Sequence, residues 1–107
     1  MMVKLDPASK KPIYEQIVQE VKSLVMTGKL LPHEQVLSVR KAAKELGVNP
    51  NTVQKSYAIL EREGILYSVT GKGDFVADNA ARIKEMKKQE IRDMFIQVTR
   101  EARDSGL

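Results

Sequence analysis

Five polar residues crowd into seven positions near the middle of the chain, and their side chains could recognise the edges of DNA bases. They are Asn49, Asn51, Thr52, Gln54 and Lys55. Amide groups can bond adenine twice in the major groove, a threonine can contact bases or a thymine methyl, and a lysine can reach guanine or a phosphate. Two of them also have purely local interpretations, because Asn49 could cap a helix and Thr52 could bond nearby backbone.

A helix-turn-helix is expected to position these side chains. The first helix should begin after Ser38, whose hydroxyl suits an N-cap, and end at Gly47, which accepts the left-handed conformation. The second should span 49–63, with Pro at its first position, and stop at Gly64. Each has one apolar side with helical spacing, formed by Ala42, Ala43 and Leu46 in the first and by Val53, Tyr57 and Leu60 in the second. Two short amphipathic helices around a glycine turn favour this motif.

The flanking segments extend the motif to a winged helix. Residues 12–26 carry an apolar stripe at helical spacing, and 28–37 is expected to be a loop bent by glycine and proline. Two β-prone runs, 65–69 and 74–77, surround a glycine-rich connection and predict a hairpin. The fold class expected is therefore α+β, mainly α, with three helices and a β-hairpin wing over residues 1–77.

The hairpin connection carries a single cation between two glycines. Gly71, Lys72 and Gly73 form a flexible tip that could enter a minor groove or rest on a phosphate. The glycines serve the turn geometry in either case. Whether Lys72 contacts DNA or is simply solvated stays open at this point.

The charges at the two helix starts run against the helix dipole, which favours acids in a first turn and bases in a last turn. Arg40 and Lys41 lie in the first turn of one helix, while Glu61 and Glu63 lie near the end of the other. Phosphates at both N-termini would explain this distribution. The alternative is that Arg40 pairs with Glu34 or Glu63 and that Lys41 is solvated.

Residues 78–107 are expected to form a separate helical tail. One apolar stripe there consists of Ile91, Met94, Phe95, Val98 and Ala102. Because burying each large apolar side chain is worth about 1.5–3 kcal/mol, an exposed row is unusual for a monomer. We expect the stripe to pair with a second copy, and a two-fold dimer would match inverted-repeat DNA with half-sites ~34 Å apart. Folding of the tail back onto its own domain is the alternative.

Composition excludes several other classes of function. The 107 residues are 42% hydrophobic and 30% charged, with a formal net charge of +4, which is typical of a globular chain and compatible with nucleic acid. There is no cysteine, and His33 is the single histidine, so no cofactor, metal site or catalytic centre is expected. No apolar run suits a membrane span or a secretory signal, so a cytoplasmic protein is expected.

Several motifs together resemble one known family. They are PIYEQI (12–17), GKLLP (28–32), SVR (38–40), LGVNPNTVQKSY (46–57), LEREGI (60–65) and GKGDFV (71–76). In this order and spacing they closely resemble the DNA-binding domain of GntR-type bacterial transcription regulators over about two thirds of the chain. The start of the second motif helix and the short tail look like the YtrA-type subgroup, whose members have a compact helical dimerisation tail.

The resemblance implies a sequence-specific regulator, expected to be a repressor, that binds an inverted-repeat operator as a homodimer with helix 49–63 in the major groove. It implies that Arg40 contacts DNA, that Ser38 binds a phosphate and that Gly71 is the wing glycine. The family usually has proline–glycine at 32–33 and leucine–proline–serine at 36–38, so the loop into the first motif helix departs from the pattern. A winged helix that binds only protein is the alternative function, and an effector cannot be identified.

Overall fold

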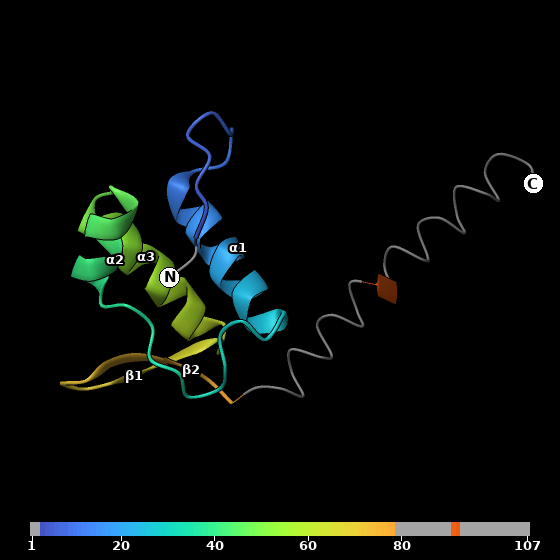
Figure 1. Ribbon diagram of the computed structural model, residues 1–107, viewed down its shortest axis with the longest axis vertical. Coiled ribbons are helices and arrows are strands. Elements are labelled where there is room, and N and C mark those ends of the chain that lie inside the picture. The colour runs from blue at the N-terminus through green and yellow to red at the C-terminus, as the bar shows by residue number, and fades with distance from the viewer. Residues whose placement is uncertain (1–2, 79–90, 93–107) are drawn as a thin grey trace, which may run out of the picture.

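The computed structural model describes residues 3–78 and 91–92, and it confirms the winged helix (Figure 1). Its elements in chain order are α1 (Ile13–Met26), α2 (Val39–Leu46), α3 (Pro50–Arg62), β1 (Leu66–Val69) and β2 (Gly73–Val76). α3 is central, because it packs against α1, α2 and β1. None of the described helices is both long enough and apolar enough to span a bilayer.

Local capping interactions set the boundaries of α2 and the start of α3, as expected. The Ser38 hydroxyl accepts a hydrogen bond from the Lys41 amide at 3.2 Å and so caps α2. Gly47 ends α2 with a φ of 68°. The Asn49 side-chain oxygen accepts from the Asn51 amide at 2.8 Å, which fixes the first turn of α3. The turn between the two helices is therefore determined by its own residues.

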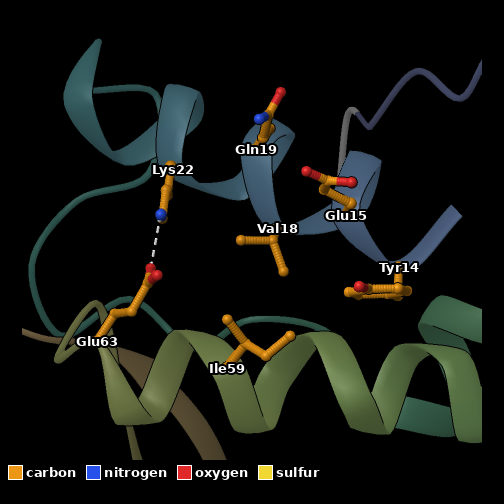
Figure 2. A pocket seen from close by; sticks show the side chains of 7 residues that line it. All are labelled: Tyr14, Glu15, Val18, Gln19, Lys22, Ile59 and Glu63. Atoms are coloured by element: carbon orange, nitrogen blue, oxygen red, sulfur yellow. Dashed lines mark ion pairs between the residues drawn. The ribbon is translucent and has the colours of Figure 1, made fainter. Parts of the chain in front are cut away.

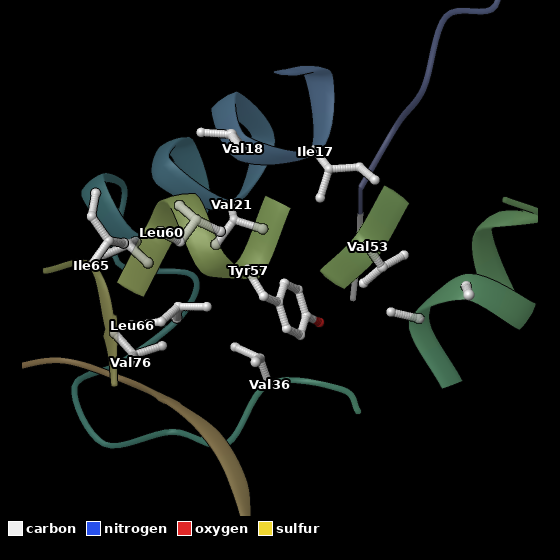
Figure 3. Close-up of a cluster of buried hydrophobic side chains, with 13 residues drawn as sticks. Ile17, Val18, Val21, Val36, Val53, Tyr57, Leu60, Ile65, Leu66 and Val76 are labelled. Carbon is white, nitrogen blue, oxygen red and sulfur yellow. The ribbon is translucent and has the colours of Figure 1, made fainter. Parts of the chain in front are cut away.

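The hydrophobic core lies around α3 (Figure 3). Val53 and Leu60 are fully buried, as are Ile17 and Val21 from α1 and Val76 from β2. Each such side chain contributes about 1.5–3 kcal/mol of transfer free energy relative to exposure. The apolar spacing of the sequence correctly identified these faces of α1 and α3.

Ser56 is a buried polar residue that the apolar spacing did not identify. It is fully buried on the side of α3 that meets α1. Its hydroxyl donates toward two carbonyl oxygens, those of Tyr14 at 2.9 Å and Thr52 at 3.0 Å, so its burial is compensated. A small hydroxyl at this position lets the two helices approach closely while remaining hydrogen-bonded.

The wing has a third, strand-like segment. β1 and β2 pair antiparallel with Tyr67 opposite Phe75. Gln35 forms a β-bridge with Phe75, and the Val36 amide donates to the Asp74 carbonyl at 3.0 Å. Residues 28–37 are a loop, as expected, but its end pairs with the free edge of β2, which supplies hydrogen-bond partners that no local pattern reveals.

His33 adopts the left-handed conformation that this loop needs, with a φ of 67°. Its amide donates to the Val76 carbonyl at 2.7 Å, and its ring Nδ1 shares a hydrogen bond of 2.9 Å with the Tyr67 hydroxyl. A non-glycine residue at positive φ costs about 1–2 kcal/mol, which these two bonds offset. The departure from proline–glycine at 32–33 is thus accommodated without loss of the turn.

Tyr57 connects α3 to the segment that enters α2. Its side chain is 2% exposed, and its hydroxyl donates to the Leu37 carbonyl at 2.7 Å. Burial, with the nearby Asp74 charge as a smaller cause, raises the pKa of the Tyr57 hydroxyl, so it remains a donor at physiological pH. Leu37 directly precedes the cap residue of α2, so this bond fixes where α2 begins relative to α3.

We predict that Tyr57→Phe destabilises the fold by about 1–2 kcal/mol, because the partly buried Leu37 carbonyl loses its donor. Urea unfolding followed by circular dichroism measures the change in the free energy of unfolding. Tyr67→Phe is the matched control, since it removes the same hydroxyl from an exposed partner, His33. Equal losses for the two variants would contradict the role given to Tyr57.

Candidate nucleic-acid interface

The first turn of α2 presents two cations to solvent. Arg40 and Lys41 are both exposed, and within residues 3–78 neither forms an ion pair. The alternative partners for Arg40 are engaged elsewhere, because Glu63 pairs with Lys22 at 2.6 Å and Glu34 accepts the Leu31 amide at 3.3 Å. The guanidinium is therefore available to an external anion. The hydroxyl of the neighbouring Ser38 is used in the cap, so a phosphate there would meet the free N–H groups of the same turn.

The first turns of α3 expose the amide side chains predicted to contact bases. Asn49, Asn51, Gln54 and Lys55 are exposed, while Thr52 is half-buried. The cap role expected for Asn49 is confirmed, and it occupies the side-chain oxygen. The side-chain amide groups of Asn51 and Gln54 have no hydrogen-bond partner in the described part of the chain, and only the backbone N–H of Asn51 is used, in the cap. These two side chains carry the strongest case for direct base contact.

Lys55 is held by an aromatic ring that the sequence analysis did not consider. Its ammonium lies 3.8 Å from the centre of the Tyr14 ring at the start of α1. Such a cation–π contact is worth about 0.5–1 kcal/mol at an exposed site. Because the next residue, Ser56, bonds the Tyr14 carbonyl, the start of α1 and the middle of α3 are joined at two adjacent positions. Lys55 is thus directed toward the start of α1.

The turn between β1 and β2, here called the wing turn (residues 69–72), is exposed at 70–72 and lies on the same side of the molecule as α2 (Figure 1). The Lys72 amide donates to the Val69 carbonyl at 2.9 Å and closes a four-residue turn. Gly71 occupies its third position with a φ of 78°, the conformation that favours glycine in a type II turn. Contrary to expectation, Gly73 belongs to β2 and not to the connection. The predicted wing residues Gly71 and Lys72 therefore lie at the tip.

The acidic end of α3 has a different explanation from the one suggested by the helix dipole. The Glu63 carboxylate forms an ion pair with Lys22 of α1. This contact explains why an acid lies at the end of α3, so explaining Glu63 by DNA phosphates at the helix N-termini is wrong. Arg62 also provides a base in the last turn of α3. Glu61 faces Asp74 of β2, and a hydrogen bond between the two carboxyl groups, followed by burial and the Asp74 charge, raises the pKa of Glu61.

The predicted dimerisation residues are mostly outside the described residues. Met94, Phe95, Val98 and Ala102 all fall in the range 93–107, for which the structure gives no description. Ile91 is described, and its side chain is 59% exposed. The dimer interface stays a prediction.

The described residues offer little that suits a metal or a small ligand. No group of three metal-ligating side chains occurs among residues 3–78 and 91–92. A hollow of about 220 Å³ lies between α1 and α3, where Val18 of α1 faces Ile59 of α3, and the Lys22–Glu63 ion pair lies at one end (Figure 2). Ligand pockets commonly measure about 300–1,000 Å³, so this hollow does not support an effector site.

Comparison with known proteins places this geometry among bacterial regulators. The family model for bacterial regulatory proteins of the gntR family matches residues 13–76. The HTH-type transcriptional repressor YtrA of Bacillus subtilis is 43% identical over 86% of this chain and 78% of its own length. The match with that repressor extends well beyond the winged helix.

Solved structures agree with the sequence comparison. The crystal structure of a transcriptional regulator from Oenococcus oeni superposes with a TM-score of 0.84 and 34% identity, covering 96% of this chain and 86% of that one. The DNA-binding domain of AraR, solved in complex with operator ORX1, gives a TM-score of 0.62 and 34% identity. That comparison covers 69% of this chain and 92% of the AraR domain.

We predict that Glu61→Gln stabilises the fold at neutral pH, because it removes the repulsion between two facing carboxylates. The pKa of Glu61 is raised above its ordinary value of 4.5, so the native state binds the proton more tightly than the unfolded state. Stability of the parent protein should therefore fall as pH rises through the window between 4.5 and the raised native pKa. Thermal unfolding from pH 4 to pH 8 should show the advantage of Glu61→Gln growing across that window. A constant difference at all pH values would contradict this assignment.

Proposed function

The chain belongs to the GntR family of bacterial regulatory proteins, and from that premise we propose that it is a cytoplasmic repressor that binds an inverted-repeat operator as a homodimer. Its family membership makes it a DNA-binding transcription regulator with a winged helix-turn-helix. The proposal adds the operator symmetry, the dimer, the sense of regulation and the residues that contact DNA. Catalysis forms no part of the proposal, since the relatives are transcription regulators.

One observation supports the proposal: the first turns of α2 and α3 expose cations and side-chain amides that have no side-chain partner within residues 3–78. Arg40 and Lys41 at the start of α2 offer phosphate contacts, and Asn51 and Gln54 at the start of α3 offer base contacts. Asn49, Thr52 and Lys55 border this surface. In AraR, a domain of the same fold is bound to operator DNA, which supports placing α3 in the major groove here.

We assign residues 1–77 to DNA binding and residues 78–107 to dimerisation through the apolar stripe at 91–102. Two-fold pairing would present two α3 helices to two half-sites about 34 Å apart. The alternative of a winged helix that binds only protein is not favoured, because it gives no role to the exposed cations and side-chain amides at the starts of α2 and α3. No effector is proposed.

We predict that Arg40→Ala and Asn51→Ala each weaken operator binding by ~1–3 kcal/mol, or about five- to 150-fold, through loss of a base or phosphate contact. The measurement is fluorescence anisotropy with an inverted-repeat duplex recovered by selection from random DNA, repeated across a salt series. Binding by phosphate contacts should lose affinity with a slope near −0.9 per contact in a double-logarithmic plot.

Matched substitutions control for net charge and for loss of an amide. Lys29→Ala removes one exposed cation from the loop after α1, and Gln19→Ala removes one exposed amide from α1 itself. Both should leave operator affinity within about twofold of the parent protein. Loss of thermal stability without loss of binding in Arg40→Ala would overturn its assigned role. Salt-independent association would favour the protein-binding alternative.

We predict that Phe95→Asp yields monomers in sedimentation velocity, because a carboxylate in the proposed apolar stripe would be buried unpaired in the dimer. The substitution lies outside the winged helix, so circular dichroism of the variant should retain the signal of the folded domain. A surviving dimer would contradict the tail as the interface. Weaker operator binding by a folded monomer is the accompanying expectation.

A further inference from the structure

We propose that Gln35 is a positioning residue for DNA binding, which clamps the wing turn so that Lys72 is presented to the duplex in one conformation. Gln35 lies in the segment between α1 and α2, 37 residues from Lys72 in the sequence. Its side-chain Nε2 donates a hydrogen bond of 2.7 Å to the Lys72 carbonyl. The inference rests on the proposed function, because it assumes that the wing contacts the operator.

Backbone hydrogen bonds on both sides of Gln35 fix the position from which its side chain reaches the wing turn. The bridge between Gln35 and Phe75 and the hydrogen bond from the Val36 amide to the Asp74 carbonyl align the segment along β2. The Val76 amide adds a bond to the Glu34 carbonyl at 2.9 Å. With its backbone fixed on both sides, the Gln35 amide reaches the turn from a rigid base.

Gly73 leaves the space that the clamp occupies. A Cβ added to Gly73 would lie 3.2 Å from Gln35 Nε2, closer than most contacts of this kind. The φ of Gly73 is 117°, which a residue with a side chain rarely adopts. The side-chain amide of Gln35 therefore fits in this position because residue 73 has no side chain.

The hydrogen bond from Gln35 reduces an entropy cost that the glycines of the wing turn would otherwise add to DNA binding. Glycines flank Lys72 on both sides, and because glycine loses more backbone entropy than other residues, ordering the tip on DNA would cost binding free energy. The pairing of Gly73 with Val69 and the closing bond from the Lys72 amide to the Val69 carbonyl hold the turn within the hairpin. The bond from Gln35 holds the Lys72 carbonyl as well, so less order has to be gained on binding.

The experiment compares Gln35→Met with Gln19→Met. Methionine keeps the length of the side chain but cannot donate to the Lys72 carbonyl. Gln19 is an exposed glutamine on α1 whose amide accepts from Lys11, and it lies outside the proposed DNA contacts. Gln35→Ala serves as a second variant, and thermal unfolding of each variant establishes that it folds.

Backbone ¹⁵N relaxation provides a readout that requires no DNA. Order parameters of the amides of Gly71, Lys72 and Gly73 should fall in Gln35→Met and stay unchanged in Gln19→Met. Unchanged order parameters in both Gln35 variants would overturn the clamp. This part of the test is independent of whether the operator is bound.

Operator affinity then tests whether the clamp serves binding. Gln35→Met should weaken binding about two- to tenfold, the range expected for one net hydrogen bond. In a Lys72→Ala background the same substitution should have no further effect, since its influence passes through the placement of Lys72. Additive losses, or a mobile tip with unchanged affinity, would overturn the inference. Failure of the parent protein to bind any operator would instead overturn the proposed function, and relaxation alone would then decide the clamp.

Discussion

The surface proposed to contact DNA, formed by the first turns of α2 and α3, depends on the hydrogen bond made by the buried hydroxyl of Tyr57. A hydroxyl taken out of water must be hydrogen-bonded, and the Leu37 carbonyl is the group that satisfies it. That bond joins the middle of α3 to the residue before the α2 cap. Because α2 is then capped by Ser38 and begins at Val39 with Arg40 exposed, this core contact helps to set the spacing between the first turns of α2 and α3.

α3 serves two environments on its two faces. One face packs against α1, α2 and β1, which explains why Ser56 as well as Val53, Tyr57 and Leu60 is buried. The other face is exposed in the same turns and carries the side-chain amides of Asn51 and Gln54. Rigid packing of one face allows polar groups on the other to be presented without rearrangement, which lowers the entropy cost of binding.

Local features of the chain predicted most of the fold, because the physics that sets them is itself local. The caps at Ser38 and Asn49 and the stop at Gly47 each involve residues within a few positions of one another. Interactions across long sequence separations escaped prediction: Ser56 with Tyr14 over 42 residues, and Gln35 with Lys72 over 37. Nothing in the spacing of Glu63 indicates Lys22 as its partner, so its position against the helix dipole finds its explanation only in the structure.

The same division separates the parts of the proposed interface. Arg40, Asn51 and Gln54 could be nominated from the sequence because their position in a helix turn already determines that they face outward. Lys55 could not be placed, since the Tyr14 ring that attracts it lies on another helix. The wing tip could be recognised by its glycines, but its order depends on Gln35 in a segment expected to be a loop. Tertiary contacts thus do not change which residues are proposed to contact DNA. They determine how firmly each of these residues is held.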